Sequence, residues 1–348
     1  MKGLRLEIRL DQVADNARRL VERCGRQGIT VTAVTKAMLG APELARSLSG
    51  VHSLGDSRVE NIERLRKAGI VAPLLLLRTP MPSQVAAVVA ANVTSVNTER
   101  EVLEALSSAA RSAGVIHDVM VMVEMGDLRE GLMPAALLPT IRDLLALSNV
   151  RLCGLGTNLA CRNGIEPSVL NMAELSATVA DIEATFGIEI GMVSGGNSAN
   201  LAWALGSGST GRINNLRLGE AILLGREPLH RQAIAGLHTT SFKLVAEVIE
   251  SQRKPTEPWG TAGQNSFGER VDVLDRGDIW QTILAVGRQD TDVADLHAPT
   301  GVEILAASSD HLITATAERR HPGEEIEFEV GYSALLRSMT SPFVAKCL

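Results

Sequence analysis

Eight short apolar segments alternate with amphipathic segments through the first two thirds of the chain, and this alternation constrains the fold more than any other feature. The apolar segments lack polar alternation, which is typical of parallel strands covered by helices. Eight strands with crossover helices over about 220 residues predict a (β/α)8 TIM-type barrel. A doubly wound sheet of six or seven strands is the alternative. The expected strands are residues 30–36, 51–54, 74–77, 93–96, 119–124, 152–156, 188–193 and 213–216.

The pattern changes after Gly225. Proline and glycine become frequent around residues 254–260, and the later apolar segments alternate with period two. Such segments are typical of antiparallel strands. We therefore expect an α/β protein with a barrel over residues 1–228 and a mostly β C-terminal domain over residues 229–348. The strands expected there are residues 244–249, 279–286, 302–306, 311–316 and 325–330.

Composition excludes several classes of partner. The chain has 348 residues and a formal charge of -6, which argues against nucleic-acid binding. Four cysteines without a Cys-x-x-Cys pair favour reduced thiols over a disulfide framework or a zinc site. The apolar runs are too short to span a bilayer, and no signal peptide is recognised. We expect a cytoplasmic protein with no metal and no membrane partner.

Lys36 closes the apolar run Val31-Thr32-Ala33-Val34-Thr35. In a barrel, functional groups gather at the carboxyl ends of the strands. Burial there would lower the pKa of the lysine, and a neutral amine is what Schiff-base chemistry requires. A surface lysine at a strand end is the alternative.

Two turns near the end of the expected barrel could bind an anion. Gly195-Gly196-Asn197-Ser198 follows the seventh strand and Gly219-Glu220 follows the eighth, which matches the recurrent phosphate site of barrels. The alternative for the first turn is an ordinary strand-to-helix connection. Arg217 ends the eighth strand, where it would either pair with a carboxylate or face a cofactor. Together with Lys36, these groups predict a site for pyridoxal 5'-phosphate.

The motifs resemble those of the alanine/ornithine racemase family of pyridoxal phosphate enzymes, and the match runs nearly end to end. They include Val34-Thr35-Lys36, Met125-Gly126-Asp127-Leu128-Arg129-Glu130-Gly131, Gly156-Thr157-Asn158-Leu159, Ser194-Gly195-Gly196-Asn197-Ser198, Asn214-Asn215-Leu216-Arg217-Leu218-Gly219-Glu220 and Ala285-Val286-Gly287-Arg288-Gln289-Asp290.

The resemblance implies an amino acid racemase that exchanges the α-proton through a Schiff base with Lys36. It implies a homodimer in which the β domain of one subunit closes the barrel of the other. The cofactor-binding residues would be Lys36, Arg129, Asn158, Asn197, Ser198, Arg217, Gly219 and Glu220. Arg217 would lie against the pyridine nitrogen, Arg129 near the phenolic oxygen and Asn158 against the ring. Ser198 and Gly219 would hold the phosphate.

The chain departs from the family where a second acid/base is needed. Alanine racemases use a tyrosine of the partner subunit opposite the lysine, and the matching position here is Arg288. Tyr332 is the only tyrosine and lies elsewhere. Arg288 is therefore included among the catalytic residues, and the candidates for the second base are Asp310, His311, Asp290 and Cys161.

A second departure concerns the substrate side chain. Ornithine-racemase-like sequences have acidic residues where this chain has Thr240 and Asn265. If those carboxylates bind a side-chain ammonium, their loss removes a charge-assisted contact. We therefore predict that the enzyme does not prefer ornithine or lysine.

Two other functions fit the same cofactor. One is a lyase or aldolase, although His297, His311 and His321 form no close metal-binding pair with cysteine. The other is a non-catalytic cofactor-binding protein, against which the large second domain argues.

Overall fold

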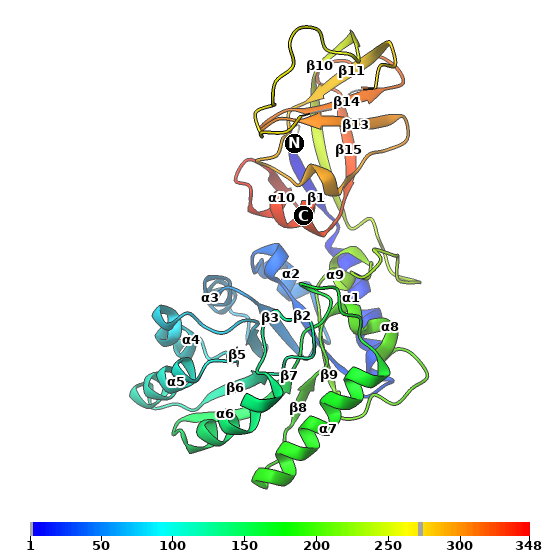
Figure 1. Ribbon diagram of the computed structural model, residues 1–348. Helices are drawn as coiled ribbons and strands as arrows, with labels where there is room; N and C mark the ends of the chain where they lie inside the picture. Colours follow the sequence, from blue (N-terminus) through cyan, green and yellow to red (C-terminus); the bar gives the residue numbers. More distant parts are fainter. Residues whose placement is uncertain (1–2, 271–273) are drawn as a thin grey trace. The chain divides into compact units, whose positions relative to one another are not determined.

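The computed structural model describes residues 3–270 and 274–348. Its first body is a closed barrel of eight parallel strands in chain order (Figure 1). The last strand pairs with the first, with Ala33 opposite Leu218, which closes the barrel and rules out the open doubly wound sheet. The barrel prediction is confirmed. The strands are β2 (Thr30–Val34), β3 (Ser53–Asp56), β4 (Leu74–Leu76), β5 (Thr94–Asn97), β6 (His117–Met122), β7 (Val150–Gly156), β8 (Met192–Ser194) and β9 (Asn215–Leu218).

Helices surround the barrel because each has one apolar face to bury. In α1, for example, Val13, Ala17, Leu20 and Cys24 are buried at helical spacing. The helices are α1 (Leu10–Gly25), α2 (Pro42–Ser47), α3 (Val59–Lys67), α4 (Val85–Ala90), α5 (Arg100–Ala113), α6 (Pro134–Ala146), α7 (Val169–Phe186), α8 (Leu201–Ala204) and α9 (Glu220–Leu224). Three short 3-10 turns accompany them, η1 (Lys36–Met38), η2 (Pro82–Gln84) and η3 (Ser198–Asn200).

Packed side chains fill the barrel interior. Leu75, Val96, Met120 and Met122 form a buried cluster in its centre. Gly156 makes room for the methionines, since a Cβ there would lie 3.1 Å from the Met120 sulfur. The interior is therefore a core and not a channel, and chemistry is left to the strand ends.

The second body is an eight-stranded sheet with the order β12-β15-β10-β11-β14-β13, to which β1 adds at β10 and β16 adds at β1. Its elements are β1 (Arg5–Ile8), β10 (Phe242–Pro255), β11 (Asp278–Leu284), η4 (Val293–Asp295), β12 (Leu296–His297), β13 (Val302–Ala307), β14 (Leu312–Thr316), β15 (Glu325–Val330), α10 (Tyr332–Thr340) and β16 (Ala345–Cys347). All of its strand pairs are antiparallel except β1 with β16.

Contacts within the chain place the boundary between the two bodies at Thr239/Thr240 and assign the residues before Leu10 to the β body. The sequence analysis placed this boundary at 228/229 and counted the N-terminal residues with the barrel. The difference arises because β1 pairs with β10 in the register Leu6 to Leu244, a partner that lies far away in sequence. In the described ranges, no helix has the length and apolarity that crossing a membrane requires.

Candidate active site

Lys36 stands at the carboxyl end of β2 as the first residue of η1. Among the described residues, its ammonium forms no hydrogen bond or ion pair. Burial lowers its pKa, and the positive charge of Arg129 lowers it further, while Cys161 and Asp56 act in the opposite direction. The surface-lysine alternative is thus not what the structure shows, since the side chain is half-buried and unpaired. This environment favours a neutral, nucleophilic amine.

Asp56 at the end of β3 orders the residues around Lys36. Its carboxylate accepts hydrogen bonds from the Thr35 hydroxyl at 2.8 Å and from the Asn61 amide at 3.0 Å. Burial raises the pKa of Asp56, and these hydrogen bonds oppose the rise. No role for Asp56 was predicted from the sequence, because a carboxylate at the end of a strand does not indicate which side chains it contacts.

Arg217 in β9 is 6% exposed and held entirely by neutral groups of neighbouring strand ends. Its guanidinium donates to the Ser194 hydroxyl at 2.5 Å and to the Thr157 carbonyl at 2.7 Å. Burial lowers its pKa to about 10, and the charge of Arg129 contributes. Within the described ranges no carboxylate pairs with it, so the salt-bridge alternative is not observed. A fixed and buried cation therefore lies at the barrel mouth.

The two predicted anion-binding turns lie together. The Ser198 hydroxyl, after β8, accepts the backbone N–H of Ala221, after Gly219, at 3.2 Å. Asn197 caps η3 through the N–H of Ala199, and its amide group donates to the Leu159 carbonyl at 2.7 Å. Glu220 forms an ion pair with Arg231, which directs its carboxylate toward a cation.

Two buried polar atoms at the end of β7 have no hydrogen-bond partner among the residues that the structure describes. They are the Asn158 amide nitrogen and the Thr157 hydroxyl oxygen. Asn158 is 8% exposed, and its other amide atom is 3.2 Å from Asn197 and 3.5 Å from Arg217. Buried polar groups are almost always paired in folded proteins. The unpaired atoms beside Arg217 are therefore available to hydrogen-bond a ligand.

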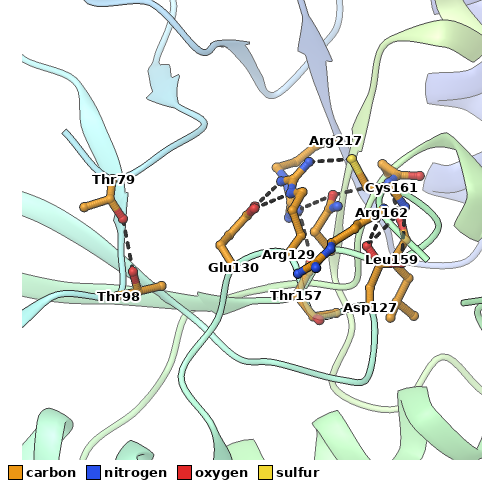
Figure 2. A network of polar contacts seen from close by, with 12 residues as sticks. Thr79, Thr98, Asp127, Arg129, Glu130, Thr157, Leu159, Cys161, Arg162 and Arg217 are labelled. Carbon is orange, nitrogen blue, oxygen red and sulfur yellow. Dashed lines mark hydrogen bonds and ion pairs between the residues drawn. The ribbon is translucent and has the colours of Figure 1, made fainter. Parts of the chain in front are cut away.

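The Arg129 guanidinium lies between Glu130 and Cys161 (Figure 2). It forms an ion pair with Glu130 and a contact of 2.7 Å with the Cys161 sulfur. Burial acts to lower the pKa of Arg129, but the hydrogen bonds and charge of Glu130 raise it overall. The guanidinium therefore stays charged close to Lys36.

Asp127 anchors the loop after β7, which carries Cys161. Its carboxylate is fully buried and accepts four backbone N–H groups from the loop after β7, the shortest at 2.9 Å from Arg162. The other donors are Cys161, Asn163 and Ile165. Burial acts to raise the pKa of Asp127, but the four donors lower it overall. Sequence reasoning missed this role, because nothing local signals a contact between two loops.

The remaining candidates belong to the β body. Arg288 pairs with Glu269 at 3.0 Å and lies over the Phe267 ring, 4.1 Å from its centroid. Asn265 uses its amide group within its own loop, donating to Glu269 at 3.0 Å and accepting from the Phe267 N–H. Thr240 precedes β10.

Three further side chains of this body were candidates for the second base. Asp310 and His311 form an exposed pair at 2.8 Å. Asp290 is buried and accepts the Ser341 hydroxyl at 3.0 Å. Over the ranges with assigned structure, no group of three or more His, Cys, Asp or Glu side chains could hold a metal ion.

The sequence matches the model of the alanine racemase N-terminal domain over residues 8–227, the range that contains the barrel and its mouth. The chain belongs to the alanine racemase family. It is 37% identical to the lysine racemase of Thermotoga maritima, covering 98% of this chain and 97% of that one. It is 34% identical to the ornithine racemase of Acetoanaerobium sticklandii, covering 98% of each.

The fold is shared with solved members of the family. The alanine racemase of Clostridium difficile superposes with a TM-score of 0.77 at 20% identity, covering 99% of this chain and 95% of that one. Since two full-length relatives are racemases, the chain is an amino acid racemase. The family and the activity expected from the motifs are confirmed.

Proposed function

We propose that this racemase uses pyridoxal 5'-phosphate, held covalently by Lys36 at the mouth of the barrel. The observation that carries the proposal is the unpaired, half-buried Lys36 amine, whose pKa is lowered by burial and by Arg129. The unpartnered amide of Asn158 beside Arg217 fits an additional group at the same strand ends. The donors and cations present therefore suit an anionic aromatic cofactor.

Each residue at the barrel mouth would have its own role in binding the cofactor. Arg217 would face the pyridine nitrogen, where a guanidinium fixed by Ser194 and Thr157 disfavours protonation. Ser198, Gly219 and Asn197 would hold the phosphate, with Glu220 orienting the same turn. Arg129 would bind the phenolic oxygen or the substrate carboxylate. The bound cofactor supplies stabilisation of negative charge at the α carbon.

Lys36 then has a second task as a proton-transfer group. An amine at the cofactor lies next to the substrate α carbon and can take or return its proton. Arg288 stays a proposed active-site residue of the β body, and Asp310 and His311 are the candidates for a second base that this body offers. A homodimer in which that body reaches the partner's barrel would bring them to the site. Sparse, unpaired cysteines favour a cytoplasmic location.

We propose a neutral amino acid as the substrate, even though the relatives are named for lysine and ornithine. Thr240 and Asn265 carry no charge, and the carboxylate nearest Asn265, that of Glu269, is already paired with Arg288. Of the described residues that contact Asn265, none would then offer an unpaired carboxylate to a side-chain ammonium. A kcat/KM for lysine or ornithine above those for alanine and serine would overturn this assignment.

The cofactor proposal is tested by spectroscopy and exchange together. Purified protein with pyridoxal phosphate should show the visible absorption of a lysine Schiff base, and Lys36→Ala should lose it. Single L- and D-amino acids in D2O should then gain α-deuterium with inversion, measured by mass spectrometry and chiral separation. Absorption that survives Lys36→Ala would refute the covalent assignment.

The shared-site dimer has its own test. Lys36→Ala and Arg288→Ala should each be inactive alone. Mixed by refolding or co-expression, they should regain about a quarter of the wild-type activity, because heterodimers keep one intact site. A monomer in sedimentation analysis, or no recovery on mixing, would refute the shared site.

A further inference from the structure

Cys161 differs from the other three cysteines of the chain. Cys24 is buried and Cys153 and Cys347 are half-buried, whereas Cys161 is exposed. It lies on the loop after β7, and its sulfur contacts the Arg129 guanidinium at 2.7 Å. The proposed cofactor residues Asn158 and Arg217 lie at the same end of the barrel. An accessible thiol thus stands inside the group of residues described above.

The backbone holds both members of this contact in place. Asp127 accepts the N–H of Cys161 itself at 3.2 Å, together with the next N–H groups of the loop. The residues directly before the pair, Leu128 and Ala160, are non-glycine residues with φ of 54° each. Such left-handed conformations persist only where the surroundings impose them. The backbone of Cys161 is therefore held in place by the fold, and the contact with Arg129 locates the sulfur.

The surroundings also suit a group that gives and takes protons. The sulfur is exposed and in contact with a guanidinium, and cysteine transfers protons through its thiol and thiolate forms. Lys36 is near enough that the charges of Arg129 and Cys161 both act on it. The unpartnered Asn158 amide marks the space for a ligand a few residues along the same loop.

We propose that Cys161 is the second acid/base of the racemase and acts on the face of the α carbon opposite Lys36. The proposal rests on the proposed function, since it requires the substrate to be held at Lys36. It also explains how a chain with Arg288 in place of the partner tyrosine racemises its substrate.

The proton balance closes without any other reactant. For one enantiomer, the Cys161 thiolate takes the α-proton, so that the C–H bond breaks and an S–H bond forms, while the Lys36 ammonium delivers a proton to the other face. For the other enantiomer, the neutral Lys36 amine takes the α-proton and the Cys161 thiol delivers one. The two groups exchange protons with water between turnovers, and nothing is oxidised or reduced.

The other candidates for the second base are less suited. Asp290 is buried and occupied by the Gly287 N–H and the Ser341 hydroxyl. Arg288 is paired with Glu269 and remains protonated at neutral pH, so it has no free base form. Asp310 and His311 already share a hydrogen bond.

The test compares Cys161→Ala and Cys161→Ser with Cys153→Ala as the matched cysteine control. Both Cys161 variants keep the backbone N–H that Asp127 accepts, so the loop should retain its structure. Each is loaded with pyridoxal phosphate, and α-deuterium incorporation is followed separately from the L- and the D-amino acid in D2O.

We expect both Cys161 variants to keep the Schiff-base absorption and to lose racemisation by at least about 100-fold. Exchange with retention should persist for one enantiomer only, the one served by Lys36. The serine variant separates proton transfer from positioning, since its hydroxyl can still contact Arg129 but is a far weaker base. The Cys153→Ala control should racemise at the wild-type rate.

Two results would overturn the assignment. The first is racemisation by Cys161→Ala within about tenfold of wild type, and the second is recovery of activity by serine, which would make Cys161 a positioning residue for Arg129. In both cases the wild type still racemises and the proposed function stands. A wild type that shows neither Schiff-base absorption nor α-exchange would instead refute the proposed function.

Discussion

His117 makes the stability of the barrel depend on pH. It begins β6, is 4% exposed, and its Nε2 lies 2.8 Å from the Ser95 hydroxyl. The same hydroxyl oxygen accepts the Asn97 amide at 3.0 Å, so its own proton is free to be donated to Nε2. Nε2 then acts as an acceptor, which requires a neutral imidazole. Burial accordingly lowers the pKa of His117 to about 4.

The size of the effect follows from this shift. The pKa falls from 6.5 to about 4 on folding, a difference worth about 3 kcal/mol. Between these two values the unfolded chain binds a proton that the folded chain rejects, so stability rises with pH across this window. The contribution is fully present above the unfolded value and is lost as the pH falls toward the folded one.

The measurement is the free energy of opening of the barrel, which is determined from hydrogen exchange of the β6 amides at several pH values between 7 and 4.5. His117→Gln should remove the titrating group and flatten the dependence in this window by about 2 to 3 kcal/mol. His52→Gln, at an exposed histidine, is the control and should leave the slope unchanged. Parallel curves for wild type and His117→Gln would refute the reasoning.

Two further substitutions test the loops at the barrel mouth by urea unfolding. Asp127→Asn turns one acceptor oxygen into a donor that faces backbone N–H groups, so we expect a loss of at least about 3 kcal/mol, with faster hydrogen exchange at residues 161–165. Asp118→Asn, which breaks only an exposed ion pair with Arg151, should cost under about 1 kcal/mol, and equal losses would refute the role of Asp127. Gly131→Ala should destabilise by more than about 2 kcal/mol, since its φ is 149° and a Cβ would lie 2.4 Å from the Glu124 nitrogen. Gly126→Ala shares the positive φ but has open space, so a similar cost for both would show that the clash is unimportant.

The barrel could be predicted because its signal is local. The strands are short and largely buried, and the pairing order follows the chain order. The pairing of the eighth strand with the first, which closes the barrel, follows from the same topology. Strand ends were less accurate: the run expected at 188–193 reduces to Met192–Ser194, because the Ile190 N–H is bound by the Glu183 side chain and not by a neighbouring strand.

The β body shows the limit of local signals. The alternating residues of β1 indicate a strand but not its sheet, and β1 pairs with β10 and β16, both more than 200 residues later. A pattern of period two fixes which face of a strand is buried and leaves the partner open. The domain boundary therefore differed from the expected one at both ends.

The same difference between local signals and long-range contacts applies to the candidate site. Lys36 and Arg217 could be predicted as neighbours, because parallel strands of a closed barrel bring their carboxyl ends together. The Asp127 contacts could not, since they join two irregular loops about 35 residues apart through backbone N–H groups. No periodicity or composition distinguishes a carboxylate that organises a loop from one that is exposed to solvent.

Charge explains why this barrel mouth suits an anionic cofactor. The charge of Arg129 lowers the pKa of both Lys36 and Arg217, so Arg129 lies close enough to repel each of these two groups. Glu130 compensates Arg129, but neutral groups alone hold Arg217, and Lys36 has no partner among the described residues. An anion bound in this space would relieve the repulsion, and burial together with the charge of Arg129 lowers the pKa of Lys36. The arrangement that would attract the proposed phosphate would therefore also favour the nucleophilic form of Lys36.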